Sequence, residues 1–285
     1  MRFIQNKSFH RFTHFRIGGK ESEKNTSMDK IKLLDGEEHE VKPLLKKMND
    51  DVFYYGELNQ LALSSSSLKL LVDSPKKYHY VQKYGQSESQ GLRDGALMHT
   101  LILEPQKFDK LNFVDVSSKN TKKYKEAVEE FGLVYTKTER ETAEKLADAL
   151  LKNEEALRLM SYSEFEVPAI GEVMGMPFRG KADILGENRI CDIKSCSDIK
   201  GFSYSAKKYG YDIQVYLYCN LFNIPYENFK FLVIDKGSLD IGVFEISENF
   251  YLQGEDKVQY GIQMYKDFFQ DKEPQLDDYI IKGIL

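Results

Sequence analysis

The chain has 285 residues, a formal charge of −5 and 41% hydrophobic and 30% charged residues. This balance is typical of a soluble globular protein and excludes a collagen-like, disulfide-framework or wholly disordered chain. No apolar run reaches the roughly 18–20 residues that a membrane-spanning helix needs, so we expect no membrane partner. The three cysteines, Cys191, Cys196 and Cys219, are an odd number. That number suits free thiols in a reducing compartment, and we expect a cytoplasmic protein.

The first fifty residues are polar. Positions 1–20 carry basic side chains and no acidic ones, interleaved with phenylalanine. This composition superficially matches an organellar transit peptide, but the absence of a long apolar core argues against a secretory signal. We expect residues 1–50 to form a loosely ordered tail, with nucleic-acid contact as the main functional alternative and Met28 as an alternative start. Residues 51–285 are expected to form one α/β domain.

Helix signals dominate up to residue 160. Serine is a favoured helix cap, so the serines before Leu68 predict a helix start, and Pro75 predicts a second one. An apolar run with an embedded histidine, Gly95–Leu103, reads as a buried helix that ends before Pro105. Three further helices are expected near Val41–Met48 and over 119–131 and 138–160.

The sequence period then changes from that of helices to that of strands. Alternating or apolar runs separated by glycine-bearing turns predict short antiparallel connections, as in hairpins. The expected strands are Glu164–Ile170, Phe178–Leu185, Arg189–Ser195, Phe229–Ile234 and Asp240–Ile246. Two helices, Tyr211–Phe222 and Asn249–Phe269, complete an α/β fold with a mixed central sheet flanked by helices and preceded by an N-terminal helical extension.

The chemistry is concentrated around Asp183, Asp192 and Lys194. Residues two apart on a strand face the same side, so Asp192 and Lys194 project together while Ile193 points to the opposite face. Asp183 lies on the preceding strand. Two carboxylates and a backbone carbonyl could therefore converge into an oxygen-rich site suited to Mg²⁺ or Mn²⁺. A neighbouring lysine can orient a water molecule and offset charge on an attacked phosphate.

A D-x-K pattern on a strand is more often a solvated charge pair than a catalytic site. Here its neighbours Ile190, Cys191 and Ile193 are apolar, which indicates a buried strand where unpaired charges are costly. Two features add to the pattern. Gln214 and Tyr218 share one face of a helix, and His99 stands in an apolar helix, where it is either a satisfied core residue or a further metal ligand.

The ordered set G-x-x-x-H, an acidic strand, G-x-x-D, D-x-K and Q-x-x-x-Y resembles the RecB-like branch of the PD-(D/E)xK nucleases, which have a restriction-endonuclease-like core. Within it, residues 55–270 resemble the RecE-type exonucleases (exodeoxyribonuclease VIII) of phages and prophages. Ser64–Tyr78 resembles that family's S-x-L…S-P-x-x-Y segment, and Lys119–Lys125 its basic stretch.

The resemblance implies a role for each matching residue. Asp183 and Asp192 would bind metal together with the backbone carbonyl of Ile193, and Lys194 would be the catalytic lysine. His99 would be an additional metal ligand. Gln214 and Tyr218 would position nucleic acid or the lysine. The pattern also includes an acidic residue of the preceding strand. Both Glu164 and Glu166 fit and share a face, so the choice between them stays open.

The resemblance implies a Mg²⁺-dependent deoxyribonuclease, with Mn²⁺ as a substitute. It would resect linear double-stranded DNA from 5′ ends and leave 3′ single strands for recombination. Its partners would be double-stranded DNA ends, a RecT-like annealing protein and further copies in a homo-oligomeric ring. Some relatives carry an iron–sulfur cluster on four cysteines, whereas this chain has three close together, so we expect no cluster. Candidate DNA contacts are Lys76, Lys77, Lys119, Lys122, Lys123, Lys125, Arg179, Lys207 and Lys208.

Two alternatives remain. The same site could belong to a structure-specific nuclease, or to a single-strand nuclease like the CRISPR-associated relatives. The fold could instead serve as a non-catalytic DNA-binding module, whose signature would be a damaged triad. Asp183, Asp192 and Lys194 are all present, which favours an enzyme.

Overall fold

The computed structural model describes residues 29–87, 89–270, 274 and 276–283, so what we expect of residues 1–28 lies outside the described part. Its centre is a five-stranded sheet in the order β5-β6-β7-β8-β9. The strands are β5 (Glu164–Val173), β6 (Met176–Gly186), β7 (Arg189–Cys196), β8 (Phe229–Asp235) and β9 (Ile241–Glu245). Only the β7–β8 pair of this sheet is parallel. The expected mixed sheet in an α/β fold is thus confirmed, and each of the five strands overlaps its predicted range.

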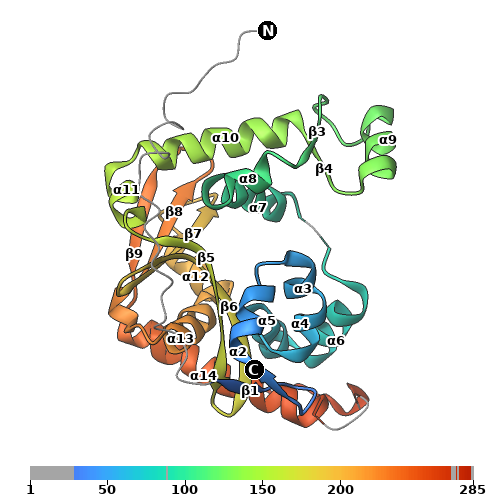
Figure 1. Cartoon of the computed structure of the whole chain (residues 1–285), viewed down its shortest axis with the longest axis vertical. Helices are drawn as coiled ribbons and strands as arrows, with labels where there is room; N and C mark the ends of the chain where they lie inside the picture. Colours follow the sequence, from blue (N-terminus) through green and yellow to red (C-terminus); the bar gives the residue numbers. More distant parts are fainter. Residues whose placement is uncertain (1–28, 88, 271–273, 275, 284–285) are drawn as a thin grey trace.

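The topology follows from the length of the connections. Short turns join β5 to β6 and β6 to β7, which permits only antiparallel neighbours. Between β7 and β8 the chain forms α12 (Phe202–Lys208), α13 (Tyr211–Phe222) and a 3₁₀ turn (Tyr226–Asn228), enough for the crossover that parallel pairing requires. This crossover places α13 against the sheet beside the acidic strands (Figure 1).

Helices cover both faces of the sheet (Figure 1). On one face, α5 (Ser65–Asp73), α13 and α14 (Glu248–Phe268) pack over side chains such as Phe178, Phe229 and Phe231. On the other, α7 (Gln90–Leu103), α10 (Lys137–Lys152) and α11 (Glu154–Met160) pack over Ile184 and Leu232. The charged residues discussed below therefore lie between two apolar cores.

Helix caps fix several boundaries. Ser64 and Ser74 accept backbone hydrogen bonds at the starts of α5 and α6 (Pro75–Tyr84). Asn153 caps α11, so the single helix expected over 138–160 is two helices. The expected helix over 119–131 is α9 (Lys122–Phe131). Short elements that the sequence did not predict surround it: α8 (Pro105–Phe108) and the parallel strands β3 (Asn112–Val114) and β4 (Val134–Thr136).

Residues 29–50 differ from the expected loose tail. They form an antiparallel pair, β1 (Lys30–Lys32) and β2 (Glu38–Glu40), followed by α2 (Val41–Lys47). Their apolar side chains Ile31, Val41 and Met48 are buried with Leu58 and with Ile170 of β5. Such burial offsets the entropy of ordering a polar segment. With α3 (Asp51–Tyr55) and α4 (Glu57–Leu61), this N-terminal extension packs onto the domain.

A final 3₁₀ turn spans Leu276–Asp278. Among the residues that the structure describes, no helix has both the length and the apolarity that crossing a bilayer requires.

Candidate active site

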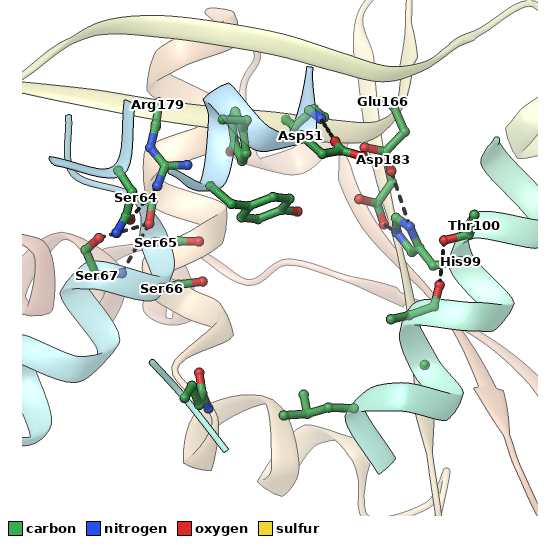
Figure 2. Close-up of a pocket in the computed structure, with 18 of the residues that line it drawn as sticks. Asp51, Ser64, Ser65, Ser66, Ser67, His99, Thr100, Glu166, Arg179 and Asp183 are labelled. Atoms are coloured by element: carbon green, nitrogen blue, oxygen red, sulfur yellow. Dashed lines mark hydrogen bonds and ion pairs between the residues drawn. The ribbon is translucent and has the colours of Figure 1, made fainter. Parts of the chain in front are cut away.

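A polar cleft of about 1010 Å³ lies between the N-terminal extension, the start of α5, α7 and strands β5–β7. Figure 2 shows its two walls. Ser64–Ser67 and Arg179 lie on one side, whereas Glu166, Asp183 and His99 point toward one another on the other. Side chains from segments far apart in the sequence thus meet in one depression, the usual setting of a ligand or catalytic site.

Three potential metal ligands converge in this cleft. The imidazole Nε2 of His99 lies 2.7 Å from Asp183 Oδ2, and its Nδ1 lies 3.2 Å from Glu166 Oε1. One ligand atom from each residue falls within 4.8 Å of the others. His99 is therefore not a satisfied core residue among apolar neighbours. Of the two glutamates that the sequence left open, Glu166 belongs to the cluster.

The backbone explains why Glu166 and Asp183 meet. They would face each other in the β5–β6 ladder, but the pairing skips them between Phe165↔Ile184 and Val167↔Ala182. Glu166 has φ = 52°, which is uncommon for a residue with a side chain. The face of the sheet to which the neighbouring side chains point also changes here. Phe165 and Ile184 contact the α7–α10 core, whereas Val167 and Ala182 contact the α5–α13 core. A local break in both strands thus directs the two carboxylates into the cleft.

A second group of charges adjoins the cluster. Asp192 is almost fully buried at 1% exposure, and its Oδ1 accepts a 2.5 Å hydrogen bond from Gln214 Nε2. Its other oxygen forms an ion pair with the ammonium of Lys194. The backbone N–H of Ile193 donates to Asp183 Oδ2 at 2.8 Å. The structure thus joins Asp183, Asp192, Lys194 and Gln214 as expected, with Asp192 next to the three-residue cluster rather than in it.

The charges in this region perturb one another. Burial opposes charge on His99, but Asp183 and Glu166 outweigh it and raise the pKa of His99 to about 9. Burial and the negative charge of Asp183 raise the pKa of Glu166 to about 7. The same two causes raise the pKa of Asp192. Burial also disfavours ionised Asp183, yet the adjacent His99 lowers its pKa. Crowded, buried carboxylates of this kind are stabilised by a cation.

This donor set fits a divalent cation. Two carboxylates and one imidazole from three different elements present ligand atoms toward one point, and hard cations such as Mg²⁺ and Mn²⁺ prefer oxygen ligands. Glu166, Asp183 and His99 would hold the ion. The contact seen for Ile193 is through its N–H, so the role of its carbonyl stays a prediction.

Tyr218 lies at the base of the cleft on α13, one turn from Gln214. Its hydroxyl accepts a 3.4 Å hydrogen bond from the backbone N–H of Lys181. A Cβ atom on Gly180 would lie 2.8 Å from the Tyr218 ring, so only glycine fits where the ring crosses the strand. Gly180 of the G-x-x-D pattern is thus explained by packing.

Of the basic residues predicted to contact DNA, some lie near the cleft and others on the outer surface. Arg179 lines the cleft but is only 3% exposed, with its guanidinium 4.4 Å above the Tyr54 ring and hydrogen-bonded to Asn59. Lys119 pairs with Glu139. The remaining lysine candidates lie on α6, α9 and α12 and do not line the cleft: Lys76, Lys77, Lys122, Lys123, Lys125, Lys207 and Lys208. The structure does not bring these lysines to the acidic cluster.

Other residues of the cleft were not predicted from the sequence. Lys181 is 9% exposed, and its ammonium lies 3.3 Å from Asp51 of α3, which also pairs with Lys107 of α8 at 2.7 Å. Asp51 thereby links the N-terminal extension to β6 and to α8. A lysine inside an apolar strand was an available signal for Lys181. Nothing in the pattern around Asp51 distinguished it.

The three cysteines are free thiols. Cys191 and Cys219 are buried in the apolar cores and Cys196 is half-buried at the end of β7. Burial raises the pKa of Cys191 to about 11, which keeps this thiol protonated and unreactive.

One solved structure supports the fold, and a second is more distant. A putative exonuclease from Eubacterium rectale is 17% identical, with a TM-score of 0.61 over 83% of this chain and 95% of that chain. A phage-related exonuclease from Haemophilus somnus 129PT is 15% identical, with a TM-score of 0.31 over 60% of this chain and 92% of that chain. No curated protein matches the chain significantly.

The model of one protein family matches residues 64–276, which include all five strands of the main sheet and every residue of the acidic cluster. That family is described as a PDDEXK-like domain of unknown function (DUF3799). The match covers well over half of the chain. The chain therefore belongs to this family of PDDEXK-like domains.

Proposed function

We propose that the protein is a divalent-metal-dependent deoxyribonuclease that hydrolyses phosphodiester bonds. More specifically, it would be a Mg²⁺-dependent exonuclease that resects linear double-stranded DNA from its 5′ ends and leaves 3′ single strands. The observation that carries the proposal is the convergence of His99, Glu166 and Asp183 beside the Asp192–Lys194 pair in one polar cleft. The ordered motifs shared with RecE-type exonucleases support the exonuclease mode and the polarity.

The residues of the site would have different roles in the proposed reaction. A divalent cation held by Glu166, Asp183 and His99 would polarise a phosphoryl oxygen and lower the pKa of a bound water. Lys194 supplies a fixed positive charge beside the cluster and offsets negative charge that develops on the attacked phosphate. Asp192, held by Gln214, fixes the position of the Lys194 ammonium. Tyr218 and Gln214 together anchor α13 to the catalytic strands.

The functional context follows from the product. A 3′ single strand is the substrate of an annealing protein, so we propose a RecT-like partner, and a ring of several copies would hold the DNA during resection. We place this activity in the cytoplasm.

The test uses an end-labelled linear duplex and a closed circular duplex, incubated with the protein in Mg²⁺ and in EDTA. We expect loss of the linear duplex alone, only in Mg²⁺, with the 5′ label released first. Release of the 3′ label first would reverse the polarity. Cutting of the circle would indicate an endonuclease, and binding without cleavage would indicate a non-catalytic DNA-binding module.

A further inference from the structure

A second cavity of about 560 Å³ continues from the catalytic cleft. The two share residues of α5, of α7 and the segment before it, of β7 and of α13: Ser66, Leu70, Gln86, Gly91, Leu92, Ser195 and Tyr211. Beyond these shared residues, the second cavity extends along the end of β7 to α12. A DNA strand bound across the acidic cluster can therefore continue into this second cavity while staying in contact with the protein.

The lining of the second cavity is basic. Lys69 and Lys236 line it together with the hydroxyls of five serines and two tyrosines, and no aspartate or glutamate is among its described lining residues. Within the part of the chain that the structure describes, neither lysine forms an ion pair with a carboxylate. The backbone N–H of Lys236 donates a 2.8 Å hydrogen bond to the carbonyl oxygen of Cys196, and its ammonium lies against Gly91.

Tyr211 connects the lysine of the D-x-K motif to the second cavity. The ammonium groups of Lys194 and Lys69 each lie 5.0 Å from the centre of its ring. Two cations thus share one aromatic ring between the cleft and the cavity. Burial and the nearby Lys194 lower the pKa of Lys69 to about 8. Asp192 and Asp212 act in the opposite direction without cancelling this shift, so an anion bound beside Lys69 would favour its charged form.

We propose that the second cavity binds the sugar–phosphate backbone of the DNA strand next to the scissile phosphate, with Lys69 and Lys236 each contacting a phosphate. This inference rests on the proposed nuclease function and extends it by naming where the strand continues. Tyr209, which is 56% exposed at the rim, offers a ring on which a base can stack. The serine hydroxyls are donors suited to the intervening phosphate oxygens.

The test measures the salt dependence of DNA binding. A short fluorescent duplex is titrated with the wild type and with Lys69→Met/Lys236→Met in EDTA, where no cleavage occurs, at several salt concentrations. Each lost phosphate contact should reduce the slope of log affinity against log salt by about 1. The double variant should therefore lose about 2 from this slope. KM for linear duplex in Mg²⁺ should rise.

Two further variants separate a contact from a structural role. Lys69→Arg/Lys236→Arg keeps both charges and should keep the wild-type slope. Lys145→Met/Lys266→Met removes two exposed lysines that line neither cavity and should also leave the slope unchanged. A wild type that binds and cuts DNA while the Lys69→Met/Lys236→Met variant keeps its slope would overturn this inference alone. A wild type that neither binds nor cuts DNA would overturn the nuclease function with it.

Discussion

Replacement of Asp183 by asparagine should reduce the rate of phosphodiester hydrolysis by about 10³-fold, equivalent to about 4 kcal/mol of transition-state stabilisation. Asp183 connects several residues of the site, because its Oδ2 contacts both His99 and the N–H of Ile193. Asparagine has nearly the same shape but carries no charge. The measurement is kcat for release of acid-soluble nucleotides from labelled linear duplex in Mg²⁺.

A matched control for this substitution is Asp94→Asn. Asp94 lies on α7, the helix that carries His99, but it lines neither cavity. We expect wild-type kcat for Asp94→Asn, and circular dichroism should show that both variants are folded. An Asp183→Asn protein that is folded and retains wild-type kcat would remove Asp183 from the catalytic site.

Replacement of Glu139 by alanine should lower the free energy of unfolding by about 3 kcal/mol, because it removes a buried, charge-assisted hydrogen bond from Arg93 and part of the cap of α10. Glu139 accepts a 2.7 Å hydrogen bond from Arg93 Nε, and the two side chains are only 5% and 8% exposed. Glu139 also accepts from the N–H of Thr136 and completes the capping box of α10. Urea denaturation followed by circular dichroism measures the loss.

An exposed ion pair on the same helix provides the comparison. Glu144 pairs with Arg140 at 2.9 Å, but the two side chains are 46% and 48% exposed, so Glu144→Ala should cost no more than about 0.5 kcal/mol. Burial disfavours ionised Glu139, but Arg93 outweighs it and lowers the pKa. Its stabilisation is therefore complete at neutral pH and is lost as the pH falls below the ordinary glutamate range. Equal costs for Glu139→Ala and Glu144→Ala would contradict this account.

The strands and the D-x-K motif were predictable because both depend on local sequence rules. Alternating or apolar runs between turns located all five strands of the main sheet, and charged residues inside apolar strands marked Asp183, Asp192 and Lys194. The one-turn spacing of Gln214 and Tyr218 predicted a shared face of a helix, and in the structure the two side chains contact Asp192 and the N–H of Lys181 on neighbouring strands. His99 could be singled out, but its surroundings could not, since its partners come from two distant strands.

The choice between Glu164 and Glu166 required the structure. Strict alternation places both on one face, whereas the positive φ of Glu166 and the unpaired position opposite Asp183 break that alternation. A single-residue break of this kind leaves no periodic signal. Lys69 was overlooked for a related reason. It stands between Leu68 and Leu70 of an amphipathic helix, and its position near Lys194 depends on how α5 and α13 pack.

The folded structure of residues 29–50 also could not be predicted from local sequence patterns. The helix expected near Val41–Met48 is α2, but strands of three residues are too short for a clear period. The stability of all three elements depends on burial against β5 and α4. Composition alone therefore indicated a tail.

The central claim is that Glu166, Asp183 and His99 form a divalent-metal site, and a Mn²⁺ titration followed by the electron paramagnetic resonance signal of free Mn²⁺ tests it most directly. Glu166→Gln and Glu164→Gln are the natural pair, since the two glutamates are separated by one residue on β5 and only Glu166 joins the cluster. We predict that Glu166→Gln weakens Mn²⁺ binding by at least about tenfold. Glu164→Gln should bind like the wild type. Unchanged Mn²⁺ affinity in Glu166→Gln, or an equal loss in both variants, would contradict the assignment of this cluster as the metal centre.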